Sequence, residues 1–140
     1  QNYPPNIQAI LKRPAPAAEL MGQELLEVDA AAGRVVVAYN ASDRLANRFG
    51  AIHGGMTAAM MDDVISLAAG LSIEWGQITP TLEMKVSYIR QGKPGTRLIA
   101  EARTIRRGKT VVFLEADLKD DAGALIATAS STIAITPLKR

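Results

Sequence analysis

The stretch Asn47-Arg-Phe-Gly-Ala-Ile-His-Gly-Gly-Met-Thr-Ala-Ala-Met-Met-Asp62-Asp63 decides how this chain folds. It holds the only histidine of the 140 residues, followed by a glycine pair where a helical pattern begins. Apolar residues recur at helical spacing from about Gly54 to Trp75, with Gly76 as a stop. One apolar stripe consists of Met56, Met60, Val64, Leu67 and Leu71. The other faces are small or apolar, so we expect a helix buried on more than one side.

Runs typical of strands surround this helix. Before it, Glu24 to Asp29 and Arg34 to Tyr39 flank a turn at Gly33 and predict a hairpin. After it come four alternating runs separated by turn signals: Thr79 to Arg90, Thr96 to Arg107, Lys109 to Lys119, and Ala124 to Thr136. In the first of these we expect Leu82, Met84, Val86 and Tyr88 on one face and Thr81, Glu83, Lys85 and Ser87 on the other.

The order of these elements predicts the fold class. A hairpin, one long helix and a four-stranded meander give an α+β protein, with a curved antiparallel sheet of about six strands wrapped around the central helix. Residues 1–21 are rich in proline and predict an N-terminal arm with a short helix, Ile7 to Arg13, capped by Asn6. The segment from Asn40 to Gly50 predicts a loop. The length favours a single domain over residues 1–140.

The composition argues against several classes of function. Sixteen basic and fourteen acidic residues give a net charge of +2, and aromatic residues make up only 4%, so we expect no nucleic-acid partner. The chain has no cysteine and one histidine, which excludes thiol chemistry and argues against a metal site. Without an apolar run of membrane-spanning length or a visible signal peptide, we expect a cytoplasmic protein and no membrane partner.

Two neighbouring carboxylates stand out in the apolar helix. Asp62 and Asp63 are the only charged residues between His53 and Glu74. A pair of aspartates is often just a solvated patch, but a solvated face would also carry Lys, Arg or Glu at helical spacing. A carboxylate desolvated on an apolar helix has a raised pKa and is a better general base. The helical wheel places Asp62 opposite the apolar stripe and Asp63 at its edge, which weakly favours Asp62 as the base.

The spacing Asn47-x5-His53-Gly54-Gly55-x6-Asp62 resembles the signature of the hotdog-fold acyl-CoA thioesterases. The most similar branch is the phenylacetate-pathway type, which includes thioesterase superfamily member 2. The resemblance runs from about residue 22 to the C-terminus and includes the run Thr81–Tyr88 and the turn Arg107-Gly108-Lys109-Thr110. It implies a hotdog fold and the hydrolysis of an acyl-CoA to CoA and a carboxylic acid, with no cofactor apart from the CoA of the substrate.

The resemblance implies catalytic roles for four residues. The backbone N–H of Gly54 would form an oxyanion hole for the thioester carbonyl, and the Asn47 side chain would help to polarise that carbonyl. Asp62 would act as general base or as nucleophile, since branches of the family differ. Thr81 stands where relatives carry a hydroxyl that helps to hold the attacking water.

The resemblance also implies residues that bind the substrate. His53 and Gly55 belong to the loop around the carbonyl, and His53 would mainly fix this loop rather than transfer a proton. Arg107 and Lys109 would lie along the path of the CoA nucleotide.

Helix geometry predicts that two chains share each site. Asp62 is eight residues beyond Gly54, or about 12 Å along a helix axis. A water that attacks a carbonyl held at Gly54 must lie within about 3 Å of its base. One protomer therefore cannot complete the site. We expect a homodimer whose antiparallel helices supply Asp62 to the partner's Gly54, and a dimer of dimers of unspecified arrangement.

Two other functions are compatible with this sequence. The first is a non-catalytic module that binds or senses acyl-CoA on the same scaffold. The second is a hotdog dehydratase, which needs a paired Asp and His and is disfavoured because the only histidine, His53, precedes the helix. The acyl group is not specified: aryl-acetyl, benzoyl-type and medium-chain groups all remain open.

Overall fold

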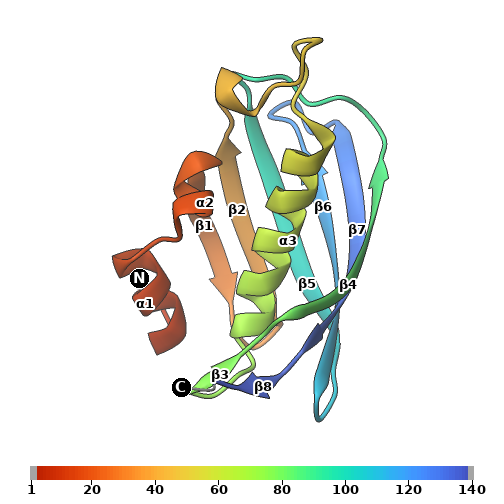
Figure 1. The fold of residues 1–140 in the computed structure, drawn as a ribbon. Helices are drawn as coiled ribbons and strands as arrows, with labels where there is room; N and C mark the ends of the chain where they lie inside the picture. Colours follow the sequence, from red (N-terminus) through yellow and green to blue (C-terminus); the bar gives the residue numbers. More distant parts are fainter. Residues whose placement is uncertain (1–2, 139–140) are drawn as a thin grey trace.

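A computed structural model describes residues 3–138, in which a long helix lies against one curved sheet (Figure 1). The helices are α1 (Pro5–Lys12), α2 (Pro16–Leu20) and α3 (Gly54–Gly70), with a 3₁₀ turn η1 (Asp43–Leu45). The strands are β1 (Gln23–Asp29), β2 (Arg34–Asn40), β3 (Gln77–Ile78), β4 (Thr81–Tyr88), β5 (Arg97–Arg107), β6 (Val111–Lys119), β7 (Leu125–Ala134) and β8 (Thr136–Pro137). The predicted α+β hotdog architecture, a six-stranded antiparallel sheet around one central helix, is confirmed.

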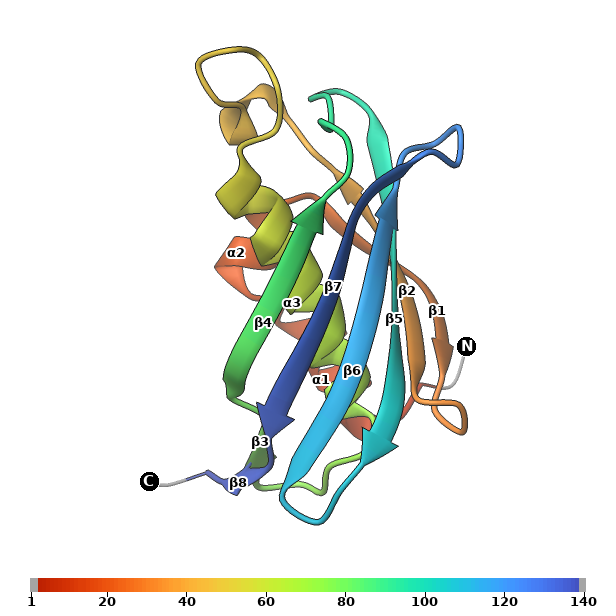
Figure 2. The same cartoon turned by 90° about the vertical axis from the view of Figure 1, so that its right-hand side faces the viewer.

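The strand order corrects one part of the prediction. The sheet runs β1-β2-β5-β6-β7-β4, and β3 pairs separately with β8 (Figure 2). The hairpin β1–β2 and the meander β5–β6–β7 are as expected, but β4 pairs with β7 instead of β5. Because β2 occupies the free side of β5, β4 joins the sheet at the opposite edge, and the connection from β4 to β5 crosses the end of the fold.

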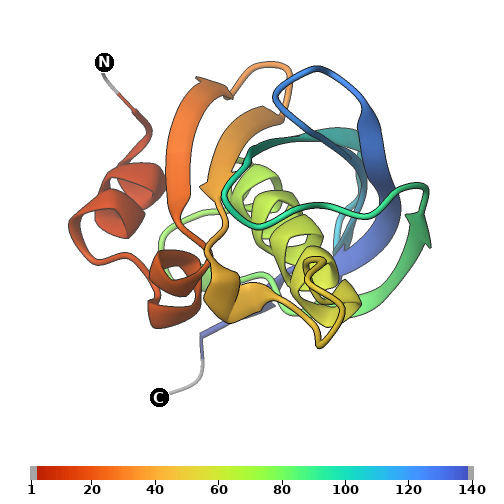
Figure 3. The same cartoon turned by 90° about the horizontal axis from the view of Figure 1, so that it is seen from above.

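The core lies between α3 and the concave face of the sheet, which curls around the helix (Figure 3). Met60, Val64 and Leu67 of the predicted stripe are buried. The facing positions of the central strands are rich in alanine, namely Ala100, Ala102, Ala116, Ala127 and Ala129. Small side chains there let the helix lie close to the sheet, so that the sheet can wrap around it.

One side of α3 is covered by neither the sheet nor the arm (Figure 1). Gly55 is exposed, and Ala58, Ala59 and Asp62 are only partly buried. This side is small and almost uncharged, unlike an ordinary solvated helix face. It is therefore suited to contact with another apolar or small-residue surface.

The helix ends earlier than its pattern predicts. The expected end was near Trp75, but α3 stops at Gly70, and Gly76 lies in the turn that follows. Asn6 donates to the carbonyl of Gly70, the last residue of the helix, and so satisfies one of its free carbonyls. Arg107 donates to the Ser72 carbonyl and holds the turn that follows.

The N-terminal arm differs in detail from the prediction. Its first helix starts at Pro5 with Pro4 as the N-cap, so Asn6 does not cap it; proline at N1 loses no intrahelical hydrogen bond. A second short helix, α2, was not predicted. Ile7 and Ala18 are buried, which shows that both helices pack onto the rest of the fold. None of the helices within residues 3–138 is long and apolar enough to cross a membrane.

Candidate functional site

The N-terminus of α3 presents an unused hydrogen-bond donor. His53 is the N-cap residue, and its Nδ1 accepts the Gly55 N–H at 2.9 Å. The His53 carbonyl accepts the N–H groups of Met56 and Thr57. Among residues 3–138, the Gly54 N–H alone of this first turn has no acceptor. A free N–H at the positive end of a helix is suited to stabilising negative charge.

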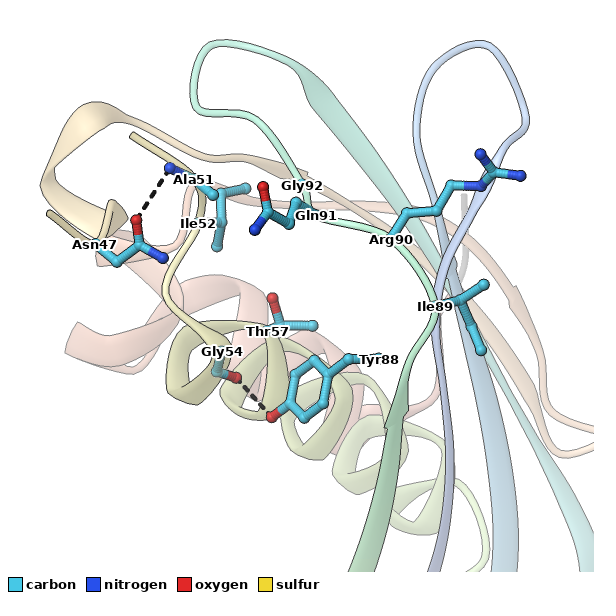
Figure 4. A pocket seen from close by; sticks show the side chains of 10 residues that line it. All are labelled: Asn47, Ala51, Ile52, Gly54, Thr57, Tyr88, Ile89, Arg90, Gln91 and Gly92. Atoms are coloured by element: carbon cyan, nitrogen blue, oxygen red, sulfur yellow. Dashed lines mark hydrogen bonds between the residues drawn. The ribbon is translucent and has the colours of Figure 1, made fainter. Parts of the chain in front are cut away.

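Asn47 is held so that its amide NH₂ is left to donate. Its Oδ1 accepts the backbone N–H groups of Phe49 at 2.9 Å and Ala51 at 3.1 Å. Two donors directed at one atom identify that atom as the oxygen, so the orientation of the amide is set by the loop itself. The NH₂ group has no acceptor among the described residues. Asn47 and Gly54 line the same pocket (Figure 4).

This first pocket has a volume of about 440 Å³ and is also lined by Tyr88, which was expected on the same face of its strand as Met84 and Val86. Tyr88 is 55% exposed, and its hydroxyl donates to the Gly54 carbonyl at 2.8 Å (Figure 4). It therefore ties β4 to the first turn of α3 and fixes the peptide beside the free N–H. The alternation of β4 gave the direction of this side chain, but no sequence pattern indicated its polar partner.

Gly55 is required by the histidine cap. A Cβ at this position would lie 3.1 Å from His53 Nδ1 and 3.2 Å from Cε1, closer than ordinary van der Waals contact. The Gly55 N–H is already used by the cap. The structure thus gives His53 and Gly55 a shared role in forming the helix start, while their contact with a substrate stays a prediction.

Asp62 and Thr81 are brought together about two turns further along the helix. The Thr81 hydroxyl donates to Asp62 Oδ1 at 2.7 Å. Asp62 Oδ2 has no hydrogen-bond partner among residues 3–138, and Asp62 is only partly buried. The pair is therefore open on the side of α3 that the protomer leaves uncovered.

A β-bulge at Leu82 makes the contact between Thr81 and Asp62 possible. Thr81 lies opposite Ile133 and Glu83 lies opposite Thr132, so Leu82 is an extra residue between them. Residues directly opposite in an antiparallel pair share a face, and Ile133 belongs to the core face. The prediction that Thr81 shares a face with Glu83 is therefore wrong. Leu82 was expected on the same face as Met84 and Val86, but the bulge turns it outward and it is 59% exposed.

Asp63 lies in a different environment from Asp62. Its Oδ2 accepts hydrogen bonds from the Tyr39 hydroxyl at 2.6 Å and from Gln23 Nε2 at 2.5 Å. Burial raises the pKa of Asp63 above its ordinary value of 3.8, the two hydrogen bonds oppose this rise, and the charge of Asp62 adds to it. Burial also raises the pKa of Tyr39, so its hydroxyl stays protonated and can donate. The sequence singled out Asp63 but gave no sign of these partners.

The turn between β5 and β6, which carries Arg107 and Lys109, lies beyond the end of α3 that is opposite to Gly54. Figure 1 shows this turn at the far end of the helix from its start. Arg107 donates to the carbonyls of Gly108 and Ser72, at 3.0 and 3.2 Å. Lys109 is exposed in the turn between β5 and β6. Within one protomer the structure therefore does not bring these cations to the pocket that contains Gly54.

The predicted residues thus form three separate groups in one protomer. Asn47, His53, Gly54 and Gly55 meet at the start of α3; Asp62 and Thr81 meet at its middle; Arg107 and Lys109 lie beyond its end. No hydrogen bond between residues 3–138 joins His53 to a carboxylate, as a dehydratase pair would require. In the same range, no three His, Cys, Asp or Glu side chains are grouped so that they could hold a metal ion.

Comparison with known proteins identifies the family. Residues 49–127 match the thioesterase superfamily. Acyl-coenzyme A thioesterase 13 of Homo sapiens is 32% identical over 106 residues, which cover 75% of each protein. The crystal structure of a phenylacetic acid degradation-related protein from Ralstonia eutropha JMP134 superposes with a TM-score of 0.85 at 34% identity, covering 92% of this chain and 98% of that one.

A vertebrate structure gives the same result. Thioesterase superfamily member 2 of zebrafish superposes with a TM-score of 0.78 at 30% identity, covering 91% of each chain. The matched family segment contains the start of α3, Asp62 and Thr81. The resemblance inferred from the sequence is therefore confirmed, and so is the enzyme class: the chain belongs to the thioesterase superfamily, a family of thioester hydrolases.

Proposed function

We propose that this protein hydrolyses acyl-CoA thioesters, with active sites shared between the two subunits of a homodimer. The observation that carries the proposal is the presence of two complementary half-sites on one helix: a free Gly54 N–H beside the Asn47 amide, and the pair Asp62–Thr81 two turns away. The substrate class is supported by the similarity to acyl-coenzyme A thioesterase 13.

The first half-site has the properties of an oxyanion hole. The thioester carbonyl oxygen would accept hydrogen bonds from the Gly54 N–H and from Asn47 Nδ2. Both donors are fixed before substrate binds, by the His53 cap, the Tyr88 contact and the Asn47 loop. A preorganised donor of this kind contributes about 3–4 kcal/mol to transition-state stabilisation.

The second half-site would deliver the water. In the general-base form of the reaction, Asp62 Oδ2 takes a proton from water while the water oxygen bonds to the carbonyl carbon. The tetrahedral intermediate then collapses, the C–S bond breaks, and the proton passes from Asp62 to the CoA sulfur. Thr81 orients the carboxylate through Oδ1 and offers its lone pairs to the same water. The reaction uses water and groups of this chain, with CoA as part of the substrate. In the nucleophile form, Asp62 attacks the carbonyl carbon, the C–S bond breaks and the CoA thiolate leaves. Water then hydrolyses the mixed anhydride, which returns the Asp62 carboxylate, frees the carboxylic acid and supplies the proton that the thiolate takes up.

The separation of the half-sites favours a dimer. Eight residues of helix hold Gly54 and Asp62 about 12 Å apart along the axis, too far for one substrate carbonyl and its water. The side of α3 that carries Asp62 is uncovered, and β4 forms an edge of the sheet. Two protomers packed with antiparallel α3 helices would bring Asp62 of one to Gly54 of the other.

The same arrangement gives Arg107 and Lys109 a role. In an antiparallel pair, the end of α3 in one subunit lies beside the start of α3 in the other subunit. The two cations of one subunit would then lie near the Gly54 half-site of the other, where the CoA phosphates would leave the pocket. Further association into a dimer of dimers is also proposed.

A hydrolysis assay with the D62N variant tests the proposal. Release of free CoA thiol is followed over a panel of aryl-acetyl, benzoyl-type and medium-chain acyl-CoA substrates. We expect hydrolysis by the parent protein, and a loss of several orders of magnitude in D62N with the fold and dimer unchanged. No turnover by the parent on any substrate would refute the function, and near-normal turnover by D62N would refute the role of Asp62.

A further inference from the structure

The two most exposed large apolar side chains among residues 3–138 lie at opposite ends of α3. Phe49, in the loop before the helix, is 84% exposed, and Trp75, in the turn after it, is 86% exposed. Figures 1 and 2 show this loop beyond the start of α3 and the turn at its other end. Neither side chain lines the pocket that contains Gly54. Aromatic side chains exposed in this way are typical anchors of protein–protein contacts.

Phe49 is presented by a closed loop. Asn47 Oδ1 accepts the N–H groups of Phe49 and Ala51, and the Asn47 N–H donates to the Ala51 carbonyl at 2.7 Å. Gly50 supplies the turn with a φ of 83°. The loop therefore holds the aromatic side chain in solvent and the Asn47 amide in place at the same time. A contact made by Phe49 acts directly on the residue that would polarise the thioester carbonyl.

Trp75 also lies in a turn that is fixed on both sides. The Glu74 N–H donates to Gln77 Oε1 at 2.9 Å, and the Gln77 N–H donates to the Glu74 carbonyl at 3.1 Å. The carbonyl of Gly76 accepts the Leu138 N–H at 2.8 Å. The indole is therefore exposed by an ordered backbone.

The two aromatic residues stand beside charges of opposite sign. Arg48 precedes Phe49, and Glu74 precedes Trp75. Arg48 and Glu74 are exposed, and neither forms an ion pair within residues 3–138. The segment Arg48–Phe49 is thus complementary to the segment Glu74–Trp75, both in apolar character and in charge.

The proposed antiparallel pair brings these two segments to the same region. When Asp62 of one subunit lies at the partner's Gly54, Gly70 lies eight residues further along the helix, about 12 Å beyond the partner's Gly54. The loop before α3 extends from the helix start in that same direction (Figure 1). Trp75 follows Gly70 by five residues, so the turn that carries it approaches the loop of the other subunit.

We propose that Phe49 of each subunit packs against the partner's Trp75, with Arg48 paired to the partner's Glu74. This inference rests on the dimer of the proposed function and adds the contact that joins each end of the helix pair. Phe49 is then a positioning residue: its anchoring in the partner holds the loop of Asn47, so the oxyanion hole is completed by the second subunit as well.

The emission of Trp75 reports the contact directly, because it is the only tryptophan of the 140 residues. In the dimeric parent we expect blue-shifted emission and weak quenching by acrylamide. F49A should shift the emission to the red, raise the quenching several-fold and increase the dissociation constant of the dimer about 30-fold or more, as measured by sedimentation equilibrium.

F113A is the matched control for F49A. Phe113 is 42% exposed, but it lies on β6 between the buried residues Val112 and Leu114, so it points away from the face that carries α3. F113A should leave the emission of Trp75 and the dimer affinity unchanged.

Crosslinking tests the pairing without any assay of activity. The chain has no cysteine, so F49C/W75C contains only the two introduced thiols. A short bismaleimide should link two chains into a covalent dimer on a denaturing gel, and F49C/F113C should give none. Within one subunit the length of α3, about 25 Å, keeps the thiols apart. Circular dichroism verifies that each variant is folded.

Charge reversal and kinetics test the two parts of the proposal. R48E and E74R should each weaken the dimer, and the combined variant R48E/E74R should restore its affinity. At protein concentrations where F49A is dimeric, its kcat should fall about tenfold, less than after loss of an oxyanion donor. F49Y retains the ring and should recover most of this loss.

The outcomes separate this inference from the proposed function. A shielded Trp75 and linked F49C/W75C chains support the inference even if the parent hydrolyses no acyl-CoA. A dimer in which acrylamide reaches Trp75 freely and F49C/W75C chains stay unlinked overturns the inference, while shared active sites remain tenable. A monomeric parent overturns the inference together with the proposed dimer.

Discussion

The Thr81 hydroxyl donates a 2.7 Å hydrogen bond to Asp62 Oδ1, from the first residue of β4 to the middle of α3. The contact depends on the bulge at Leu82, which returns Thr81 to the helix side of the sheet. Among residues 3–138, it leaves Asp62 Oδ2 without a partner. A carboxylate held by one oxygen and open at the other is prepared to accept a proton.

Removing the Thr81 hydroxyl should therefore impair turnover. In T81V the shape of the side chain is preserved while the hydrogen bond is lost, so kcat should fall about 10- to 100-fold. T81S retains the hydroxyl and should keep most of the activity. Steady-state kinetics on one well-cleaved acyl-CoA compare the three proteins. Equal kcat values in T81V and T81S would contradict the role given to the hydroxyl.

The Asn47 amide can be tested separately from its loop. N47D keeps an oxygen for the Phe49 and Ala51 N–H groups, so the loop should remain folded, but it replaces the NH₂ donor by a second oxygen. Loss of an oxyanion donor predicts a fall in kcat of about 100- to 1,000-fold. Thermal melting serves as the control. If N47D melts like the parent and also turns over like it, Asn47 has only a structural role.

His53 should matter for stability more than for proton transfer. H53A removes the cap that accepts the Gly55 N–H and should lower the free energy of unfolding by about 0.5–2 kcal/mol. H53N retains a capping side chain and should recover much of that loss. Urea unfolding and kinetics are measured on both variants. If H53N is as stable as the parent but as inactive as D62N, then His53 takes part in the chemistry.

Asp63 should make stability depend on pH in a definite direction. Its pKa in the folded state is raised above the ordinary value of 3.8. At a pH between 3.8 and the folded-state pKa, Asp63 therefore keeps a proton in the folded state that it has released in the unfolded state. The component that Asp63 contributes to the free energy of unfolding of the parent therefore decreases as pH rises through this range.

The D63N variant lacks that component. The unfolding free energy of D63N minus that of the parent should increase as pH rises from about 4 through the folded-state pKa, and then level off. Urea unfolding at a series of pH values measures the difference directly. A difference that decreases over the same range would mean that the folded state favours the ionised form of Asp63.

Much of the fold follows from local patterns in the sequence. The apolar period after His53-Gly54-Gly55 predicts the central helix, and alternation with glycine turns predicts the strands of the sheet. The position of β4 at the edge beside β7 was not predictable in this way, because it depends on which strand fills the other side of β5. At the helix end, the Gly70 carbonyl accepts a hydrogen bond from Asn6, a residue distant in sequence that the helical period does not indicate.

The sequence proposed the residues of the candidate site but left most of their contacts unspecified. The motif singled out Asn47, Gly54 and Asp62, and helix spacing alone separated Gly54 from Asp62. The bulge that brings Thr81 to Asp62 interrupts the period-two pattern and cannot be read from it. The Tyr88 contact with Gly54 and the Tyr39 contact with Asp63 depend on strand register, which local patterns do not specify.

The central claim, that each active site uses Asn47 and Gly54 of one subunit and Asp62 of the other, is tested most directly by mixing two inactive variants. D62N and N47D subunits carrying different affinity tags are co-expressed, and the mixed dimer is purified through both tags. One of its two sites then combines Asn47 of the D62N subunit with Asp62 of the N47D subunit.

The mixed dimer should recover about half of the parental kcat per dimer, although each homodimer is nearly inactive. Its other site carries both substitutions and should contribute nothing. Activity no greater than the mean of the two homodimers would show that each site is built within one subunit, and would contradict the account.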